Sequence, residues 1–478
     1  MAATINLRSV FPFWIAASLI ISPFPAFPLV SGAHFYDNQR LIEISCALFA
    51  FVVIWFQLLN GSAIPLPISR PITLQLALFF LLGLVSSSIA YSLRHAFFEW
   101  ANFLLLFGVS WLVASEISAK GDLLLDKILM LCGLACAVYI LLEIAIYISV
   151  LKAGIQPKPS QLIVGFDNYR FFNHVQTISL PMLGLMAARM PDRGRKLFWW
   201  GVAALWWMLF FVSAGRGTFI GLTVAIAMVW CSMPKAAGAW CRSMLVSGLA
   251  GLVAYLFFYA AVPRILGLEP FGFFFTTADR TIENPTSGRL LLWTRALEMI
   301  GGNPWLGAGP GHFAHYGRDL KIGAHPHNWP LQIGSEWGMP ALLLLNGVLA
   351  LAMLRLWQLR KIISAKDRDT LTVWLVTGCA ILVDGLVSGL IVMPTSQLWI
   401  ALYVGCAWGW TYSLSPSVKI VAFRPSVVRR ATISLGALLM IYILVHGIWP
   451  EAKEIIASNA CYSKQTVFAP RIFINGSF

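Results

Sequence analysis

The chain has 478 residues, of which 59% are hydrophobic and only 11% are charged. A soluble domain carries about 25% charged residues, so this composition excludes a water-soluble particle of this size. The net charge of +14 would suit a nucleic-acid-binding protein, but the basic residues are scattered over short loops and form no continuous stripe. The composition therefore predicts a membrane protein that binds no nucleic acid.

Apolar residues fall in runs of roughly 17–25, the length that crosses a bilayer as a helix. Backbone groups in lipid must satisfy their own hydrogen bonds, and no alternating barrel pattern appears. We therefore predict an all-α polytopic membrane protein with about 12–13 transmembrane helices. The candidate spans lie near 11–30, 41–58, 73–90, 97–114, 123–149, 175–189, 197–213, 217–232, 244–262, 337–354, 371–392, 396–412 and 431–449. The first is interpreted as a retained helix and not a cleaved signal peptide.

The expected organisation is one membrane domain with a single large soluble excursion and no internal repeat. We expect N-terminal transmembrane helices over 1–262, a large loop over 263–336, C-terminal transmembrane helices over 337–449 and a short tail over 450–478.

The orientation follows from the distribution of Lys and Arg. Fifteen of them lie in four short loops, 189–196, 233–243, 355–370 and 413–430. The alternating turns 213–216 and 393–395 carry one and none. Because short loops rich in Lys and Arg stay in the cytoplasm, we expect these four inside. The N-terminus is then inside, whereas the segment 150–174, the large loop and the tail from Pro450 are outside.

The large loop is the least membrane-like part of the chain and holds four of the eight histidines. Residues 289–300, beginning at Arg289, have helical character. A turn rich in Gly and Pro follows from Asn303 to Gly311. His325, His327 and Asn328 then precede a new helix that we expect to enter the membrane near Trp337.

Three motifs in this order resemble the signature of the O-antigen ligase and polymerase superfamily. SAGRGTF (Ser213–Phe219) matches its early turn; Arg289 then leads to NPWLGAGPGHF (Asn303–Phe313) and to HNWPLQIGSEWG (His327–Gly338). The resemblance covers residues 165–350 in motif detail and the remainder in hydropathy. It implies a GT-C-like membrane glycosyltransferase whose donor is a glycan on a polyprenyl diphosphate.

The residues of these motifs suit that chemistry. Arg216 and Arg289 are expected to bind the donor diphosphate, since a guanidinium contacts phosphate oxygens bidentately and does not deprotonate. His327 is the expected base for the acceptor hydroxyl, because histidine titrates near neutral pH. Negative charge that develops on the diphosphate would be stabilised by both arginines in a poorly hydrated site.

Structural explanations stand beside these roles. Arg216 would otherwise be an interfacial anchor, Arg289 a loop salt-bridge residue and His327 a helix cap. Further residues are expected to support the site: Glu336, Asn328, His325, Arg170 and His174. For Arg170 and His174, ordinary loop structure explains the sequence equally well.

No metal and no cofactor are expected. The outer side carries no DxD or adjacent acidic pair. His325 and His327 lack an acidic or cysteine partner at helpful spacing, so the resemblance and the residues together predict metal-independent transfer.

The leading hypothesis is a ligase in the bacterial inner membrane. It would move O-antigen from undecaprenyl diphosphate to lipid A–core on the periplasmic face, with membrane lipids around it. The alternatives are a pilin-type protein O-oligosaccharyltransferase, then an O-antigen polymerase, which differ in the acceptor. A transporter or flippase is a fourth hypothesis, for which Glu143 and Asp384 are the intramembrane ionisable candidates.

Overall fold

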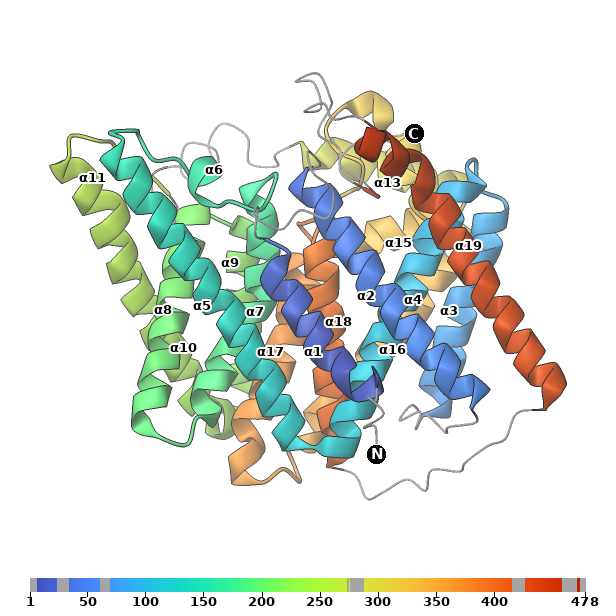
Figure 1. Cartoon of the computed structure of the whole chain (residues 1–478), viewed down its shortest axis with the longest axis horizontal. Helices are drawn as coiled ribbons and strands as arrows, with labels where there is room; N and C mark the ends of the chain where they lie inside the picture. Colours follow the sequence, from blue (N-terminus) through green and yellow to red (C-terminus); the bar gives the residue numbers. More distant parts are fainter. Residues whose placement is uncertain are drawn as a thin grey trace.

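The computed structural model describes residues 7–23, 34–60, 69–272, 275, 288–414, 426–457 and 471–472. Within these residues all regular structure is helical, and Figure 1 shows the long helices running side by side as a bundle. The predicted all-α polytopic fold is confirmed.

Each predicted span overlaps one long helix where it is described. In chain order these helices are α1 (Leu7–Ile21), α2 (Phe35–Leu59), α3 (Arg70–Ser88), α4 (Leu93–Lys120), α5 (Asp122–Lys152), α7 (Tyr169–Arg189), α8 (Arg193–Ser213), α9 (Arg216–Ser232), α10 (Pro234–Tyr255), α16 (Met339–Leu359), α17 (Arg368–Asp384), α18 (Pro394–Ser413) and α19 (Val427–Ala457). Residues 24–30 of the first span lie outside the described residues, and the span 244–262 continues from α10 into η1 (Leu256–Ala261). The helix α10 begins ten residues before its predicted span, because the polar stretch from Pro234 is already helical.

Eight helical runs are individually long and apolar enough to cross a membrane. They are α2, α3, α4, α5, α8, α16, α19 and the continuous run Pro234–Ile265. The other predicted spans are shorter or more polar, and three of them, α7, α17 and α18, are among the most buried helices of the chain. Burial inside protein explains their polar residues, because a side chain such as Gln176 finds hydrogen-bond partners there and not in lipid.

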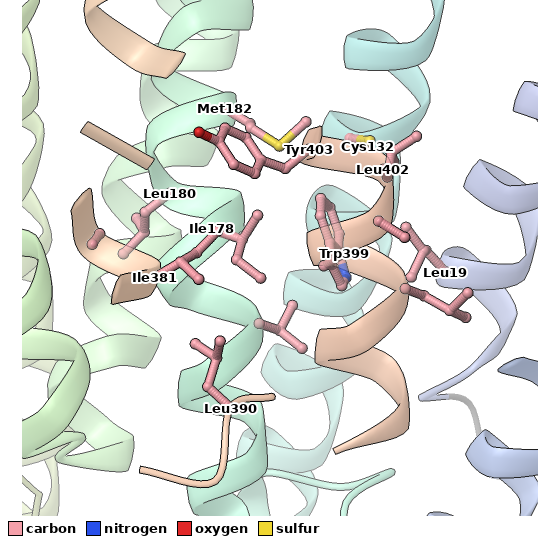
Figure 2. Packing of buried hydrophobic residues seen from close by; sticks show 14 of the residues in the cluster. Leu19, Cys132, Ile178, Leu180, Met182, Ile381, Leu390, Trp399, Leu402 and Tyr403 are labelled. Carbon is pink, nitrogen blue, oxygen red and sulfur yellow. The ribbon is translucent and has the colours of Figure 1, made fainter. Parts of the chain in front are cut away.

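The centre of the bundle is a packed apolar layer between these three helices. Figure 2 shows Ile178 and Met182 of α7 facing Ile381 of α17 and the rings of Trp399 and Tyr403 of α18. All five are nearly excluded from solvent, and the Tyr403 hydroxyl donates to the Trp374 carbonyl oxygen at 2.7 Å. Close packing of this kind makes the helix ends that emerge from it rigid.

The two ends of the bundle differ in what they carry. The short connections from α7 to α8, from α9 to α10 and from α16 to α17 lie at one end, and the starts of α7 and α9 lie at the other, with α13 (Arg289–Gly302). The predicted cytoplasmic loops therefore share one end of the molecule, as far as their residues are described; 415–425 lie outside the described residues.

Short helices complete the chain. Besides α13 they are α6 (Pro159–Leu162), η1 (Leu256–Ala261), α11 (Val262–Ile265), α14 (Phe313–Tyr316), η2 (Arg318–Leu320), α15 (Trp329–Trp337) and η3 (Ala365–Asp367). The helix predicted over 289–300 is α13, which continues through the glycine pair 301–302 and ends at Asn303. The predicted large loop is therefore largely helical where it is described; residues 276–287 lie outside the described part.

The predicted tail does not behave as a free segment. The helix α19 continues past Pro450 to Ala457, and Arg471 and Ile472 are buried among the other helices. Residues 458–470 and 473–478 lie outside the described part of the chain.

Candidate active site

A pocket lies where α7, α9 and α13 begin and α17 ends. It holds about 570 Å³ of space, part of it open to the surroundings. Its lining residues are Arg170, Asn173, His174, Ala214, Gly215, Arg216, Gly217, Thr218, Arg289, Asp384, Val387 and Ser388. Four predicted site residues, Arg170, His174, Arg216 and Arg289, are thus brought together from three elements. We call this the arginine pocket.

The SAGRG turn shapes one wall. The helix α8 ends at Ser213, and Ala214 adopts the left-handed conformation (φ 55°, ψ 46°) that reverses the chain into α9. A Cβ atom on Gly217 would collide with the Asp384 carboxylate, and one on Gly215 would collide with the Asn173 side chain. Glycine on both sides of Arg216 therefore lets α7 and α17 close on this turn.

Arg216 is also the first residue of α9. The first N–H groups of a helix have no acceptor within it, and the helix dipole places partial positive charge there. Because residues 214–218 line the pocket, these N–H groups add to the side-chain charge. Helix N-termini of this kind bind phosphate groups.

Positive charge exceeds negative charge in the arginine pocket. Three guanidiniums line it, and Asp384 is the one carboxylate among its lining residues. Burial and the charges of Arg216 and Arg170 lower the pKa of Arg289, whereas Asp384 acts in the opposite direction. Such an arrangement favours an anion in the pocket.

Asp384 was missed as a site residue. It is fully buried, and its Oδ2 accepts hydrogen bonds from the hydroxyls of Thr177 (2.6 Å) and Thr218 (3.2 Å). The sequence suggested it only as a carboxylate inside a span for the transporter hypothesis. A carboxylate at the end of an apolar run is costly unless it is paired, and that signal could have linked it to an arginine.

The histidine segment is bound to the turn that follows α17. The Trp329 N–H donates to the Gly385 carbonyl oxygen at 2.9 Å, and Asn328 Nδ2 donates to the Leu386 carbonyl oxygen at 3.0 Å. Asn328 also caps α15, since its Oδ1 accepts from the Leu331 N–H at 2.9 Å. The capping residue is therefore Asn328 and not His327.

His327 lies beside the arginine pocket, although it is not one of its lining residues. Burial, followed by the charges of Arg289, His174 and Arg170, lowers the pKa of His327 to about 3. Its imidazole is therefore neutral at physiological pH, and the expectation that this histidine titrates near neutral pH is wrong for the unliganded protein.

His325 packs behind this histidine. It is almost fully buried, and the two imidazole centroids are 4.0 Å apart. The His327 N–H donates to His325 Nδ1 at 3.3 Å. His325 thus contacts His327 and not the pocket itself, which makes its role supportive.

Glu336 joins two of the motifs. Its Oε1 accepts from the Phe313 N–H at 3.1 Å, and its backbone carbonyl oxygen accepts from the Gly309 N–H at 2.9 Å. The NPWLGAGPGHF turn is therefore fastened to the end of α15. Glu336 is fully buried and lies outside the arginine pocket.

Residues 201–345 match the family model described as O-Antigen ligase. This match over part of the chain supports the O-antigen ligase superfamily. Members of this family are glycosyltransferase-like ligases, which agrees with the resemblance seen in the motifs. No curated protein matches the chain.

The matched O-antigen ligase segment contains Arg216, Arg289 and His327 but not the whole pocket. Arg170, His174 and Asp384 line the same pocket from outside the segment. Among the described residues, no group of three or more His, Cys, Asp or Glu could hold a metal ion. The site of this ligase domain is thus built mainly from guanidiniums and imidazoles.

Proposed function

We propose that this protein transfers a glycan from undecaprenyl diphosphate to an acceptor hydroxyl, with lipid A–core as the acceptor. The observation that carries the proposal is the convergence of Arg170, Arg216 and Arg289 in one pocket beside His327. Three cations at a helix N-terminus suit a diphosphate better than any neutral ligand.

The donor diphosphate would lie between the guanidiniums of Arg216 and Arg289. Each can give two parallel N–H···O bonds to phosphate oxygens. Arg170 is more exposed and would contact the outer part of the donor, where His174 also lines the pocket. The polyprenyl chain would extend into the surrounding membrane.

The transfer step has a simple balance. The acceptor oxygen forms a bond to the anomeric carbon while its proton passes to the neutral imidazole of His327. The bond between the anomeric carbon and the diphosphate oxygen breaks, and undecaprenyl diphosphate leaves with the electron pair. The guanidiniums stabilise the added negative charge on that leaving group. No metal is required for this step.

The site would face the periplasm across the bacterial inner membrane. The basic loops described in the structure lie at the bundle end opposite the pocket, and the Lys/Arg rule assigns that end to the cytoplasm. A reporter fused at Lys366 should be active only in the cytoplasm; periplasmic activity would overturn this orientation.

A transfer assay with purified protein tests the function directly. A lipid-linked glycan is offered with lipid A–core, a pilin-like protein and a second lipid-linked glycan in parallel reactions. Transfer to lipid A–core supports the ligase. Transfer to the protein or to the second glycan would instead identify an oligosaccharyltransferase or a polymerase, and donor movement without a new glycosidic bond would identify a flippase.

A further inference from the structure

Arg471 is an arginine buried completely inside the fold. It comes after the last long helix, yet its guanidinium pairs with Glu99 of α4 and Glu336 of α15. Burying a guanidinium is costly unless it is paired and hydrogen-bonded. Its partners therefore show what its position depends on.

Two buried carboxylates and one amide surround the guanidinium. Arg471 Nη2 lies 2.6 Å from Glu336 Oε2 and 3.1 Å from Glu99 Oε1. With its amide oriented so that oxygen faces the guanidinium, Gln332 Oε1 accepts from Nη1 at 2.8 Å and from Nη2 at 2.9 Å. We call these four residues the Arg471 hub.

The backbone of the same segment is held from the opposite side. The Tyr36 hydroxyl donates to the Arg471 carbonyl oxygen at 2.6 Å, and Arg40 Nη2 donates to it at 2.9 Å. Arg40 Nε donates to the Ile472 carbonyl oxygen at 2.9 Å. Side chain and backbone together fix Arg471 between α2, α4 and α15.

The Arg471 guanidinium binds one face of α15. Gln332 and Glu336 are four residues apart, so they point to the same side of this helix. Its first residue, Trp329, follows the His327–Asn328 pair. Glu336 also accepts a hydrogen bond from the Phe313 N–H in the NPWLGAGPGHF turn. The Arg471 guanidinium is therefore connected to both motifs of the large loop through Glu336.

Arg471 also acts on the histidines. Burial lowers the pKa of His325 well below its usual range, and the charges of His327, Arg471 and His174 add to this effect. Because His325 packs directly on His327, the charge of Arg471 acts on the neighbour of the proposed base.

We propose that Arg471 is a positioning residue of the transfer site, which fixes α15 through Gln332 and Glu336 and thereby holds His327 beside the arginine pocket. This inference rests on the proposed function. It gives Arg471 a role in transfer, because its contacts with α15 then complete the geometry of the base.

The test compares transfer with donor binding. Arg471→Lys keeps the positive charge but loses the fork that bridges two carboxylates and an amide. We expect kcat to fall roughly 10²-fold, as for a misplacement of about 1 Å, while binding of the lipid-linked donor changes less than about twofold. Equal losses of kcat and donor binding, or full activity, would overturn the proposal.

A triple variant separates positioning from charge balance. Arg471→Met with Glu336→Gln and Glu99→Gln removes the guanidinium together with both carboxylates that it pairs with, so no unpaired charge is left in the hub. If Arg471 only neutralises these two carboxylates, this variant recovers the wild-type kcat, and the proposal is wrong. If Arg471 positions α15, kcat stays low in protein that remains monodisperse. Arg189→Ala is the matched control, because Arg189 pairs with Asp122 and Asp126 where α7 ends beside the start of α5, and it should retain kcat.

A measurement without turnover distinguishes this inference from the proposed function. Hydrogen exchange of residues 303–313 and 327–337 should increase in Arg471→Lys protein, whereas the start of α9 should keep its protection. Unchanged exchange at α15 would refute the positioning role. If wild-type protein transferred nothing to any acceptor, the proposed function would fail, while the exchange result would still decide whether Arg471 holds α15.

Discussion

The arginine pocket and the Arg471 hub use the same kinds of side chain in opposite ways. In the pocket, three guanidiniums meet one carboxylate and border open space. In the hub, one guanidinium meets two carboxylates and an amide, and every member is buried. Because an unpaired charge is costly away from water, excess positive charge beside open space indicates a place for an anion, whereas a guanidinium enclosed by carboxylates indicates a scaffold. The ratio of guanidiniums to carboxylates, and not residue type, separates the two regions.

The largest effect should come from removing the pocket charge. The double variant Arg216→Ala/Arg289→Ala is expected to lose all detectable transfer, because no bidentate contact to the diphosphate remains there. The single Arg→Ala variants should each lose about 10²–10³-fold or more, and Arg→Lys should lose most of the activity. Initial rates and donor binding of purified protein measure this.

Arg295→Ala is the control on the same helix. Its guanidinium is paired with Asp319 and Glu298 at the surface, so activity should be retained. Normal donor binding and transfer by Arg289→Ala would show that the pocket arginine is structural and that the comparison above is misplaced.

Removing the proposed base should lower the transfer rate less than removing both Arg216 and Arg289. His327→Ala is expected to lower kcat by about 10²–10⁴-fold, the usual contribution of a general base, with donor binding intact. The loss should shrink at high pH, where the hydroxyl depends less on a base. His325→Ala should be milder. If His327→Ala lost donor binding as much as transfer, His327 would be a diphosphate ligand and Glu336 the next base to test.

Removing the carboxylate of Asp384 should strengthen donor binding in the arginine pocket. Asp384→Asn takes away the negative charge nearest the guanidiniums, so the donor KM is expected to fall by about fivefold, or about 1 kcal/mol. Asp369→Asn, at the other end of α17, should leave the KM unchanged. A higher KM in Asp384→Asn would mean that the carboxylate holds the arginines in place and does not oppose the donor.

The pH profile of the free enzyme should be nearly flat. The pKa of His327 is lowered to about 3, so its base form is already populated from pH 5 to 8. On this account kcat/KM does not fall as the pH drops from 8 to 5. An unperturbed histidine would lose about tenfold per unit below pH 6.5. If the wild-type protein showed such a loss and His325→Ala protein did not, a group other than His327 would be the base.

Chelation should have no effect. No cluster of metal-ligating side chains occurs among the described residues, and guanidiniums supply the positive charge that a divalent ion often provides. Transfer rates with and without EDTA are expected to agree. Loss of activity that magnesium or manganese restores would contradict the metal-independent mechanism.

The sequence predicted the pocket better than it predicted the hub. Apolar run lengths located every long helix, and the motifs named Arg216 and Arg289 before the structure placed them together. The hub depends on Arg471 meeting Glu336 across 135 positions. No local pattern reports such a contact, and the segment around Arg471 resembles a polar tail. Asp384 was not predicted as a site residue for the same reason, since its hydrogen-bond partners come from α7 and α9.

The backbone of His327 carries a further consequence. Its φ of +52° lies in the left-handed region, where a side chain costs on the order of 1–2 kcal/mol and glycine costs little. His327→Gly should therefore raise the thermal midpoint slightly while it abolishes the base. A variant library sorted for heat resistance is expected to drift to glycine at this position, and one sorted for glycan transfer to keep histidine. At position 327, thermal stability and transfer activity therefore favour different residues.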